Sequence, residues 1–150
     1  MNEPTINNYN KGMFDVSNKA DTLRYAIAQA IIKVTPSTLN LIKNHKTPKG
    51  DIIEAAKISA TLGAKKTWEL IPYCHLIPID HISTQLSFYE CTIEIKVSVK
   101  SVWKTGVEME ALTGCSIAAL AVYDMLKPID EYLSIESIKL LGKIGGKGDF

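Results

Sequence analysis

The stretch Leu23-Arg-Tyr-Ala-Ile-Ala-Gln-Ala-Ile-Ile-Lys-Val-Thr35 decides how the rest of the chain can fold. Its many alanines suit a helix, whereas its last residues, Ile31-Ile32-Lys33-Val34-Thr35, suit a β-strand. As a strand, it gives the helices that follow a sheet to cross, and we favour this interpretation. As a helix, it leaves only three strands for the sheet.

The segments after this stretch alternate between helical and strand patterns. Asp51, with Glu54 three residues later, forms a capping-box pattern that predicts the start of a helix. Residues 92–103 alternate between Ile or Val and Glu, Lys or Ser, which predicts a strand with one buried face. The expected elements are a short helix over 36–44 capped by Ser37, a helix from Asp51 to about Leu70, strands over 80–88 and 92–103, a long apolar helix over 107–126 and a last strand over 133–141.

With residues 23–35 as the first strand, the element order is β-α-α-β-β-α-β. This is the split-βαβ, ferredoxin-like plan of α+β proteins, with one extra helix in the first crossover. We therefore expect an antiparallel sheet with helices packed on one face. Residues 1–12, which are polar and rich in Asn, are expected to form a flexible N-terminal arm, and 13–150 a single domain.

Composition excludes several classes of protein. The net charge of +1 gives no general attraction to nucleic acid or to an anionic membrane. We expect no membrane span, because no apolar run approaches the roughly 20 residues that a span needs. The three cysteines are widely spaced, without a Cys-x-x-Cys pair, as is typical of a reduced cytoplasmic protein.

The long apolar helix carries ionisable residues at both ends. Glu108 and Glu110 lie at its start, and Asp124 and Lys127 at its end. Ionisable groups on a buried helix are costly unless they are paired or used, so both ends are candidate sites. Asp124 and Lys127 share a helix face and can form either a proton-transfer pair or a solvated ion pair. The two acids either face a site or compensate the helix dipole.

Three further places carry candidate groups. Cys74-His75 follows an expected helix and can contact a ligand, but neither His45 nor His81 lies at a zinc-ligand spacing from it, so we expect no metal. Lys49 precedes a helix start, where backbone amides and a lysine favour anions. Lys143 and Lys147 lie in a glycine-rich tail that can wrap a phosphate or form a loose basic end. Together these groups suit a phosphorylated substrate and proton transfer without metal or cofactor.

The sequence resembles the cyclic pyranopterin monophosphate synthase family, molybdenum cofactor biosynthesis protein C. The matching segments are Met13-Phe-Asp-Val-Ser17, Lys49-Gly-Asp51, Gly63-Ala-Lys-Lys-Thr67, Leu70-Ile-Pro-Tyr-Cys-His75, Lys104-Thr-Gly-Val-Glu-Met-Glu-Ala-Leu-Thr113, Tyr123-Asp-Met125 and Gly145-Gly-Lys-Gly-Asp149. The resemblance implies a catalytic domain that converts a cyclic dihydroguanosine triphosphate to cyclic pyranopterin monophosphate and pyrophosphate. It also implies a homohexamer, a trimer of dimers, with active sites at dimer interfaces.

The resemblance also assigns roles to residues. It places the catalytic aspartate at Asp124, its partner at Lys127 and a further catalytic lysine at Lys49. The implied substrate contacts are Tyr73, Cys74, His75, Glu108, Met109, Glu110, Lys143 and Lys147. This sequence differs from the family pattern at Leu76, where the family has proline, and in a tail that is one residue shorter. About 20 Å of helix separates Glu110 from Asp124, which fits a site completed by a neighbouring chain.

Two other functions fit parts of the pattern. A nucleic-acid module on the same plan would stack bases on sheet aromatics, but the strand over 92–103 has an aromatic residue, Trp103, only at its end. A partner-binding protein would use the small residues of the long helix as an oligomer interface. Measured turnover separates both from an enzyme.

Overall fold

The computed structural model describes residues 12–146 and 148–150. Most of the expected flexible arm, and the expected substrate contact from Lys147, lie outside these residues. The elements are β1 (Thr22–Lys33), α1 (Pro36–Lys43), α2 (Ile52–Lys65), α3 (Thr67–Leu70), β2 (His81–Tyr89), β3 (Thr92–Trp103), α4 (Glu108–Leu126) and β4 (Ser134–Ile144).

The stretch that decides the fold is a strand, as predicted. In β1, Ala26, Ala28 and Ala30 are fully buried on one face, and the residues between them are partly exposed on the other. The period of two places every alanine against the helices, where a small side chain lets a helix approach closely. Packing therefore outweighs the intrinsic helix preference of alanine here.

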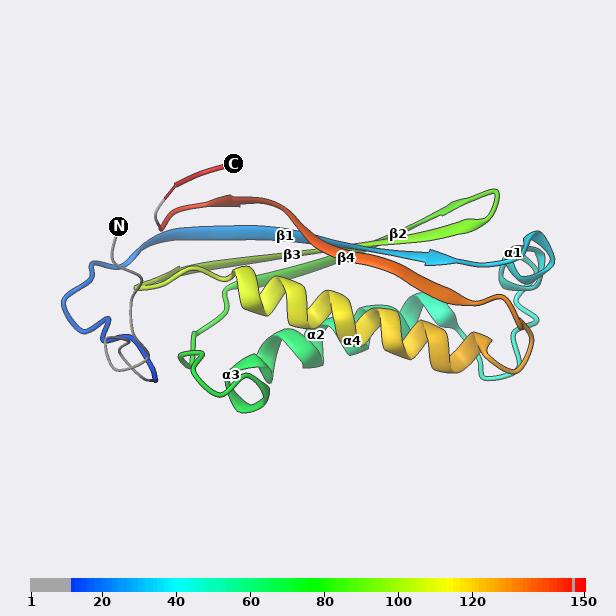
Figure 1. Cartoon of the computed structure of the whole chain (residues 1–150), viewed down its shortest axis with the longest axis horizontal. Helices are drawn as coiled ribbons and strands as arrows, with labels where there is room; N and C mark the ends of the chain where they lie inside the picture. The colour runs from blue at the N-terminus through cyan, green and yellow to red at the C-terminus, as the bar shows by residue number, and fades with distance from the viewer. Residues whose placement is uncertain (1–11, 147) are drawn as a thin grey trace, which may run out of the picture.

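The four strands form one antiparallel sheet in the order β2-β3-β1-β4. β1 lies at its centre and pairs with β3 along its whole length, from Thr22 opposite Trp103 to Lys33 opposite Thr92. The long helices α2 and α4 cover one face of this sheet, and the other face is open (Figure 1). The order and connections confirm the predicted split-βαβ, α+β fold.

Three predicted boundaries are wrong. The N-cap of α1 is Thr35, whose hydroxyl accepts a hydrogen bond from the Thr38 N–H, and not Ser37. The helix that Asp51 caps ends at Lys65, after which Lys66 leaves helical geometry and α3 begins as a separate turn. The last strand continues to Ile144, because it pairs with β1 as far as Tyr25.

The core lies between the sheet and the two long helices. Ile93, Ile95, Val97 and Val99 of β3 are fully buried, as the alternating pattern predicts. α4 crosses α2 at Gly114, where an added Cβ atom would lie 2.8 Å from the backbone oxygen of Ala60. The small residues Gly114, Cys115, Ala118 and Ala119 of α4 are buried and therefore serve contacts within the chain.

The expectation that no apolar run approaches the length of a membrane span is wrong for α4. Within the described residues, α4 is long and apolar enough to span a membrane by length and composition, with a mean hydropathy of 1.3. Half of its apolar window is buried inside the fold, where α4 packs on α2, β1 and β3. A core helix passes the same test, and the packing explains its composition.

Candidate functional site

A pocket of about 540 Å³ opens at the N-terminal end of α4. Four segments that are distant in sequence form it: the segment before β1, the loop after α3, the start of α4 and the end of β4. Its lining includes Tyr73, Cys74, His75, Glu108, Met109, Glu110 and Lys143. The fold thus gathers seven of the predicted site residues around one cavity.

The segment before β1 forms one wall of this pocket and is hydrogen-bonded to the loop after α3. His75 Nε2 donates a hydrogen bond to the backbone oxygen of Phe14 at 2.7 Å, and Phe14, Asp15 and Val16 all line the cavity. The loop that carries His75 is itself ordered by a turn in which the Cys74 N–H bonds to the Ile71 oxygen at 3.1 Å. His75 therefore has a defined orientation at the wall of the pocket.

Glu110 differs sharply from its neighbour Glu108. It is 3% exposed, and its Oε2 atom has no hydrogen-bond partner among the described residues. Burial, with a smaller contribution from the charge of Glu108, raises the pKa of Glu110 to about 7. A carboxyl group with that pKa can both donate and accept a proton near neutral pH.

Glu108 is instead paired across the pocket. Its Oε1 atom lies 3.4 Å from Lys143 Nζ, which β4 supplies. A side chain at Gly106 would collide with the Glu108 carboxylate, so the glycine leaves the space in which this ion pair forms. The structure thereby distinguishes the two acids, which sequence spacing could not: Glu108 is ion-paired and Glu110 is buried.

The tail that carries Lys143 is folded back and is not a loose basic end. The N–H of Phe150 bonds to the Lys143 oxygen at 2.9 Å, and the Lys143 N–H bonds to the Phe150 oxygen at 2.8 Å. Gly145 and Gly146, with φ of +93° and +71°, form the turn, and the Gly145 N–H bonds to Asp149 Oδ1 at 2.7 Å. Lys143 therefore lies on a backbone that is hydrogen-bonded on both sides.

Sequence reasoning missed Arg24, a buried cation beside this pocket. Arg24 is 4% exposed and donates to the backbone oxygens of Trp103 and Lys104 at 3.1 Å. No carboxylate of the described residues lies within ion-pair distance of it. The signal for it was its register in β1, where Arg24 falls on the buried face together with Ala26, Ala28, Ala30 and Ile32.

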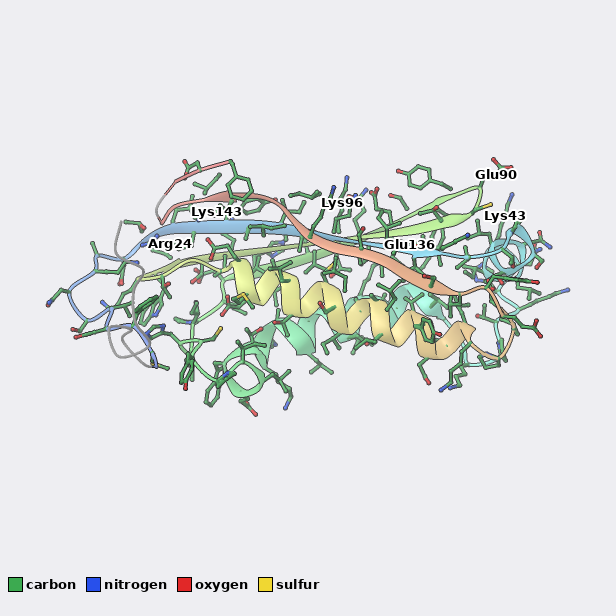
Figure 2. The ribbon with its side chains drawn as sticks, viewed as in Figure 1. Arg24, Lys43, Glu90, Lys96, Glu136 and Lys143 are labelled. Carbon is green, nitrogen blue, oxygen red and sulfur yellow. The ribbon has the colours of Figure 1, made fainter. Side chains whose placement is uncertain are left out.

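Arg24 and Lys143 approach each other at one end of the molecule (Figure 2). A Cβ atom built on Gly146, which lines the pocket, would lie 3.6 Å from Arg24 Nη1 and 4.0 Å from Lys143 Nζ. An anion at this edge would meet two positive charges and a glycine turn that allows close approach.

The other predicted catalytic residues lie at the opposite end of α4. Lys49 Nζ is 3.0 Å from Asp124 Oδ2, and Lys127 Nζ is 3.0 Å from Asp124 Oδ1. We call Lys49, Asp124 and Lys127 the lysine–aspartate cluster. Hydrogen bonds from Lys127 and then Lys49 lower the pKa of Asp124. The Asp124 side chain is 54% exposed, so within one chain it forms solvated ion pairs with the two lysines.

A single chain therefore holds two separate groups. The 19 residues of α4 span about 28 Å at 1.5 Å per residue, with the pocket at one end and the lysine–aspartate cluster at the other. Figure 2 shows this separation: Lys43, the last residue of α1, lies at the end of the molecule where α4 ends, far from Arg24 and Lys143.

Within residues 12–146 and 148–150, no three His, Cys, Asp or Glu residues are grouped to hold a metal ion.

Glu110→Gln is expected to remove a pH dependence of stability. The carboxyl pKa rises from 4.5 in the unfolded chain to about 7 in the fold, so Glu110 increasingly opposes folding as pH rises between these values. Wild type should lose about 3 kcal/mol relative to Glu110→Gln between roughly pH 5 and pH 8, measured by urea unfolding. Glu131→Gln, at an exposed turn, is the control; parallel pH curves for wild type and Glu110→Gln would contradict the expectation.

Comparison with known proteins gives a consistent match over most of the chain. The MoaC family model matches residues 13–146. The cyclic pyranopterin monophosphate synthase of Aquifex aeolicus is 46% identical over 136 residues, which are 91% of this chain and 54% of that protein. Those of Syntrophomonas wolfei and Brevibacillus brevis are each 47% identical, over 90% and 92% of this chain and 87% and 88% of theirs. The chain thus spans about half of the first relative and most of the other two.

Among solved structures, the full extracellular region of zebrafish Gpr126/Adgrg6 aligns with 83% of this chain and 14% of its own length. The TM-score of 0.34 and the identity of 14% are too low to bear on fold or function.

Proposed function

This chain belongs to the MoaC family, and from that premise we infer that it is a cyclic pyranopterin monophosphate synthase. It converts 3′,8-cyclo-7,8-dihydro-GTP to cyclic pyranopterin monophosphate with release of pyrophosphate. The reaction is that of a phosphorus–oxygen lyase and belongs to molybdenum cofactor biosynthesis.

The observation that carries the proposal for the site is the pocket at the start of α4. Its volume of about 540 Å³ lies in the range of small-molecule sites. Tyr73 and Met109 contribute apolar surface to its wall, and Glu110 contributes a buried carboxyl group. Lys143 makes one edge of the pocket positive, and Arg24 beside it adds a second positive charge. A ligand with a flat heterocycle and a phosphate chain matches this combination.

We propose that a neighbouring chain completes the site. The reaction needs phosphate binding and proton transfer at one place, whereas about 20 Å of α4 separates Glu110 in the pocket from Asp124 in the lysine–aspartate cluster. A two-fold axis across the middle of α4 would place the cluster of one chain beside the pocket of its partner. The family resemblance extends this proposed dimer to a homohexamer, a trimer of dimers, with active sites at the dimer interfaces.

Exposed apolar residues on the long helices support association. Ile58 and Leu62 on α2 are 58% and 50% exposed, and Leu120 on α4 is 55% exposed. Such residues are normal singly, but these lie on two helices that pack side by side. We propose that this surface contributes to the contact between chains.

The groups then have coherent roles. Lysines and Arg24 hold the triphosphate, and Asp124 accepts the proton of the ribose-derived hydroxyl whose oxygen bonds to the α-phosphorus. The bond from that phosphorus to the pyrophosphate oxygen breaks, and the ammonium groups of Lys49 and Lys127 stabilise the growing negative charge. We propose cytoplasmic action without metal or cofactor; the three free cysteines suit a reducing compartment.

The test is direct incubation with 3′,8-cyclo-7,8-dihydro-GTP. The purified chain should yield cyclic pyranopterin monophosphate by mass spectrometry, with one pyrophosphate released per product. GTP, which lacks the bond between ribose and base carbon, is the control and should be left intact. If the purified protein is a folded oligomer but leaves the cyclic triphosphate unchanged, the proposed synthase activity is wrong.

A further inference from the structure

A buried aspartate and a buried threonine join two helix ends behind the lysine–aspartate cluster. Asp130, which is 6% exposed, lies in the turn between α4 and β4. Its Oδ2 atom accepts hydrogen bonds from the Thr38 hydroxyl at 2.8 Å and from the Thr35 N–H at 2.9 Å. Its Oδ1 atom accepts from the Tyr132 N–H at 2.9 Å. One carboxylate therefore ties the end of α4 to the start of α1.

The cluster cannot hold its own geometry. The side chains of Lys49, Asp124 and Lys127 are 43%, 54% and 57% exposed. Ion pairs at such exposure contribute about 0–1 kcal/mol and weaken with salt. Groups that act in catalysis must be held to within about 0.5 Å, so the backbone beneath the cluster has to supply the precision.

The hydrogen bonds of the Asp130 carboxylate to Thr35 and Thr38 link it to the backbone segment that continues through α1 to Lys49. Thr35 and Thr38 form the first turn of α1, and the turn after α1 is bonded back to it by the Lys46 N–H and the Leu41 oxygen at 2.9 Å. The Thr47 hydroxyl then donates to the Gly50 oxygen at 2.6 Å, across the residues that include Lys49. Fixing the start of α1 therefore fixes the turn that presents Lys49.

We propose that Asp130 is a positioning residue, which through Thr35 and Thr38 holds α1 against the end of α4 and so keeps Lys49 within reach of Asp124 and Lys127. The proposal rests on the catalytic role of the lysine–aspartate cluster given under the proposed function. Asp130 itself contacts no substrate in this proposal; it acts by fixing the position of Lys49.

The charge of Asp130 makes the link strong. Burial raises its pKa, but the hydrogen bonds from Thr35, Thr38 and Tyr132 outweigh burial, and the pKa lies below its usual value. Asp130 is therefore an ionised acceptor, whose hydrogen bonds are stronger than those of a neutral group. An asparagine amide nitrogen at the Oδ2 position would face the Thr35 N–H, and two donors cannot bond to each other.

The experiment compares Asp130→Asn, Thr38→Val and Thr38→Ser. Valine matches threonine in shape but lacks the hydroxyl, whereas serine keeps it. Asp130→Asn and Thr38→Val should lower kcat about 10- to 100-fold with KM changed far less, because misplaced groups lose rate. They should also raise the pKa of Asp124, followed by carbon-13 NMR of its carboxyl group, as Lys49 moves away. Thr38→Ser should stay near wild type in both measurements.

A double variant separates positioning from general damage to the fold. In a Lys49→Ala background, Asp130→Asn should cost little further kcat, because both changes remove the same contribution. If the kcat of the double variant fell by the product of the two single reductions, the proposal would be overturned. An unchanged pKa of Asp124 in Asp130→Asn would overturn it as well. The pKa measurement needs no turnover, so it tests the link even if wild type is inactive, an outcome that counts against the proposed function instead.

Discussion

Replacing Gly114 with alanine is expected to be among the most destabilising small substitutions in this chain. The new methyl group would lie 2.8 Å from the backbone oxygen of Ala60, and it also approaches Ala64 and Val97. A backbone oxygen in a helix cannot rotate away, so α2 and α4 must separate. Overpacking of this kind costs about 1–3 kcal/mol or more, and the helix preference of alanine offsets at most about 1 kcal/mol of it.

Two other glycines give a graded comparison. A Cβ atom at Gly63 would lie 2.9 Å from Ile117 Cγ1, which can rotate, 3.0 Å from Ile117 Cβ and 3.2 Å from Gly114 Cα. Because none of these contacts is as short as the one at Gly114 and the shortest can be relieved by rotation, Gly63→Ala should cost less. A Cβ atom at Gly148 would meet no atom within 4 Å, so Gly148→Ala is the matched control. Urea unfolding should rank the losses Gly114, then Gly63, then Gly148. Equal stability of Gly114→Ala and Gly148→Ala would contradict the close packing of α2 on α4.

This crossing shows which parts of the fold are readable from the sequence. The alternation in β3 and the Gly and Ala content of α4 each depend on local period and size, and both were interpreted correctly. The break between α2 and α3 was not, because residues 66–70 continue a helical pattern and only tertiary context bends the chain at Lys66. The cap of α1 was missed for a similar reason, since Thr35 and Ser37 are both good caps and Asp130 selects the first.

In the site, too, local sequence features were predictable, whereas features set by tertiary contacts were not. The family resemblance predicted substrate contacts from Tyr73, Cys74, His75 and Met109, and the structure brings these four residues to one pocket. Sequence spacing could not distinguish Glu108 from Glu110, because the difference is a partner on β4 for one and burial for the other. Arg24 was missed because its surroundings come from residues about 80 positions away, the carbonyls of Trp103 and Lys104.

Asp124→Asn is expected to abolish product formation while leaving the fold intact. The carboxylate is 54% exposed and makes only surface ion pairs, so its loss should change stability by less than about 1 kcal/mol. Loss of the proposed proton acceptor should lower kcat by about 10²- to 10⁴-fold. Lys143→Ala should inactivate the other half of the site in the same way. Thermal unfolding and single-turnover assays measure the two effects, with exposed Lys139→Ala as the surface control.

Mixing these two inactive variants tests whether the halves belong to different chains. A shared site draws Asp124 from one chain and Lys143 from its partner, so a mixed dimer carries one site with both changes and one intact site. Random assembly of equal amounts, after co-expression with distinct tags, should therefore restore about one quarter of wild-type activity. A site contained within one chain would always hold one of the two changes, and no mixture would recover activity. Recovery near one quarter would therefore support a pocket and a lysine–aspartate cluster that meet across a subunit boundary.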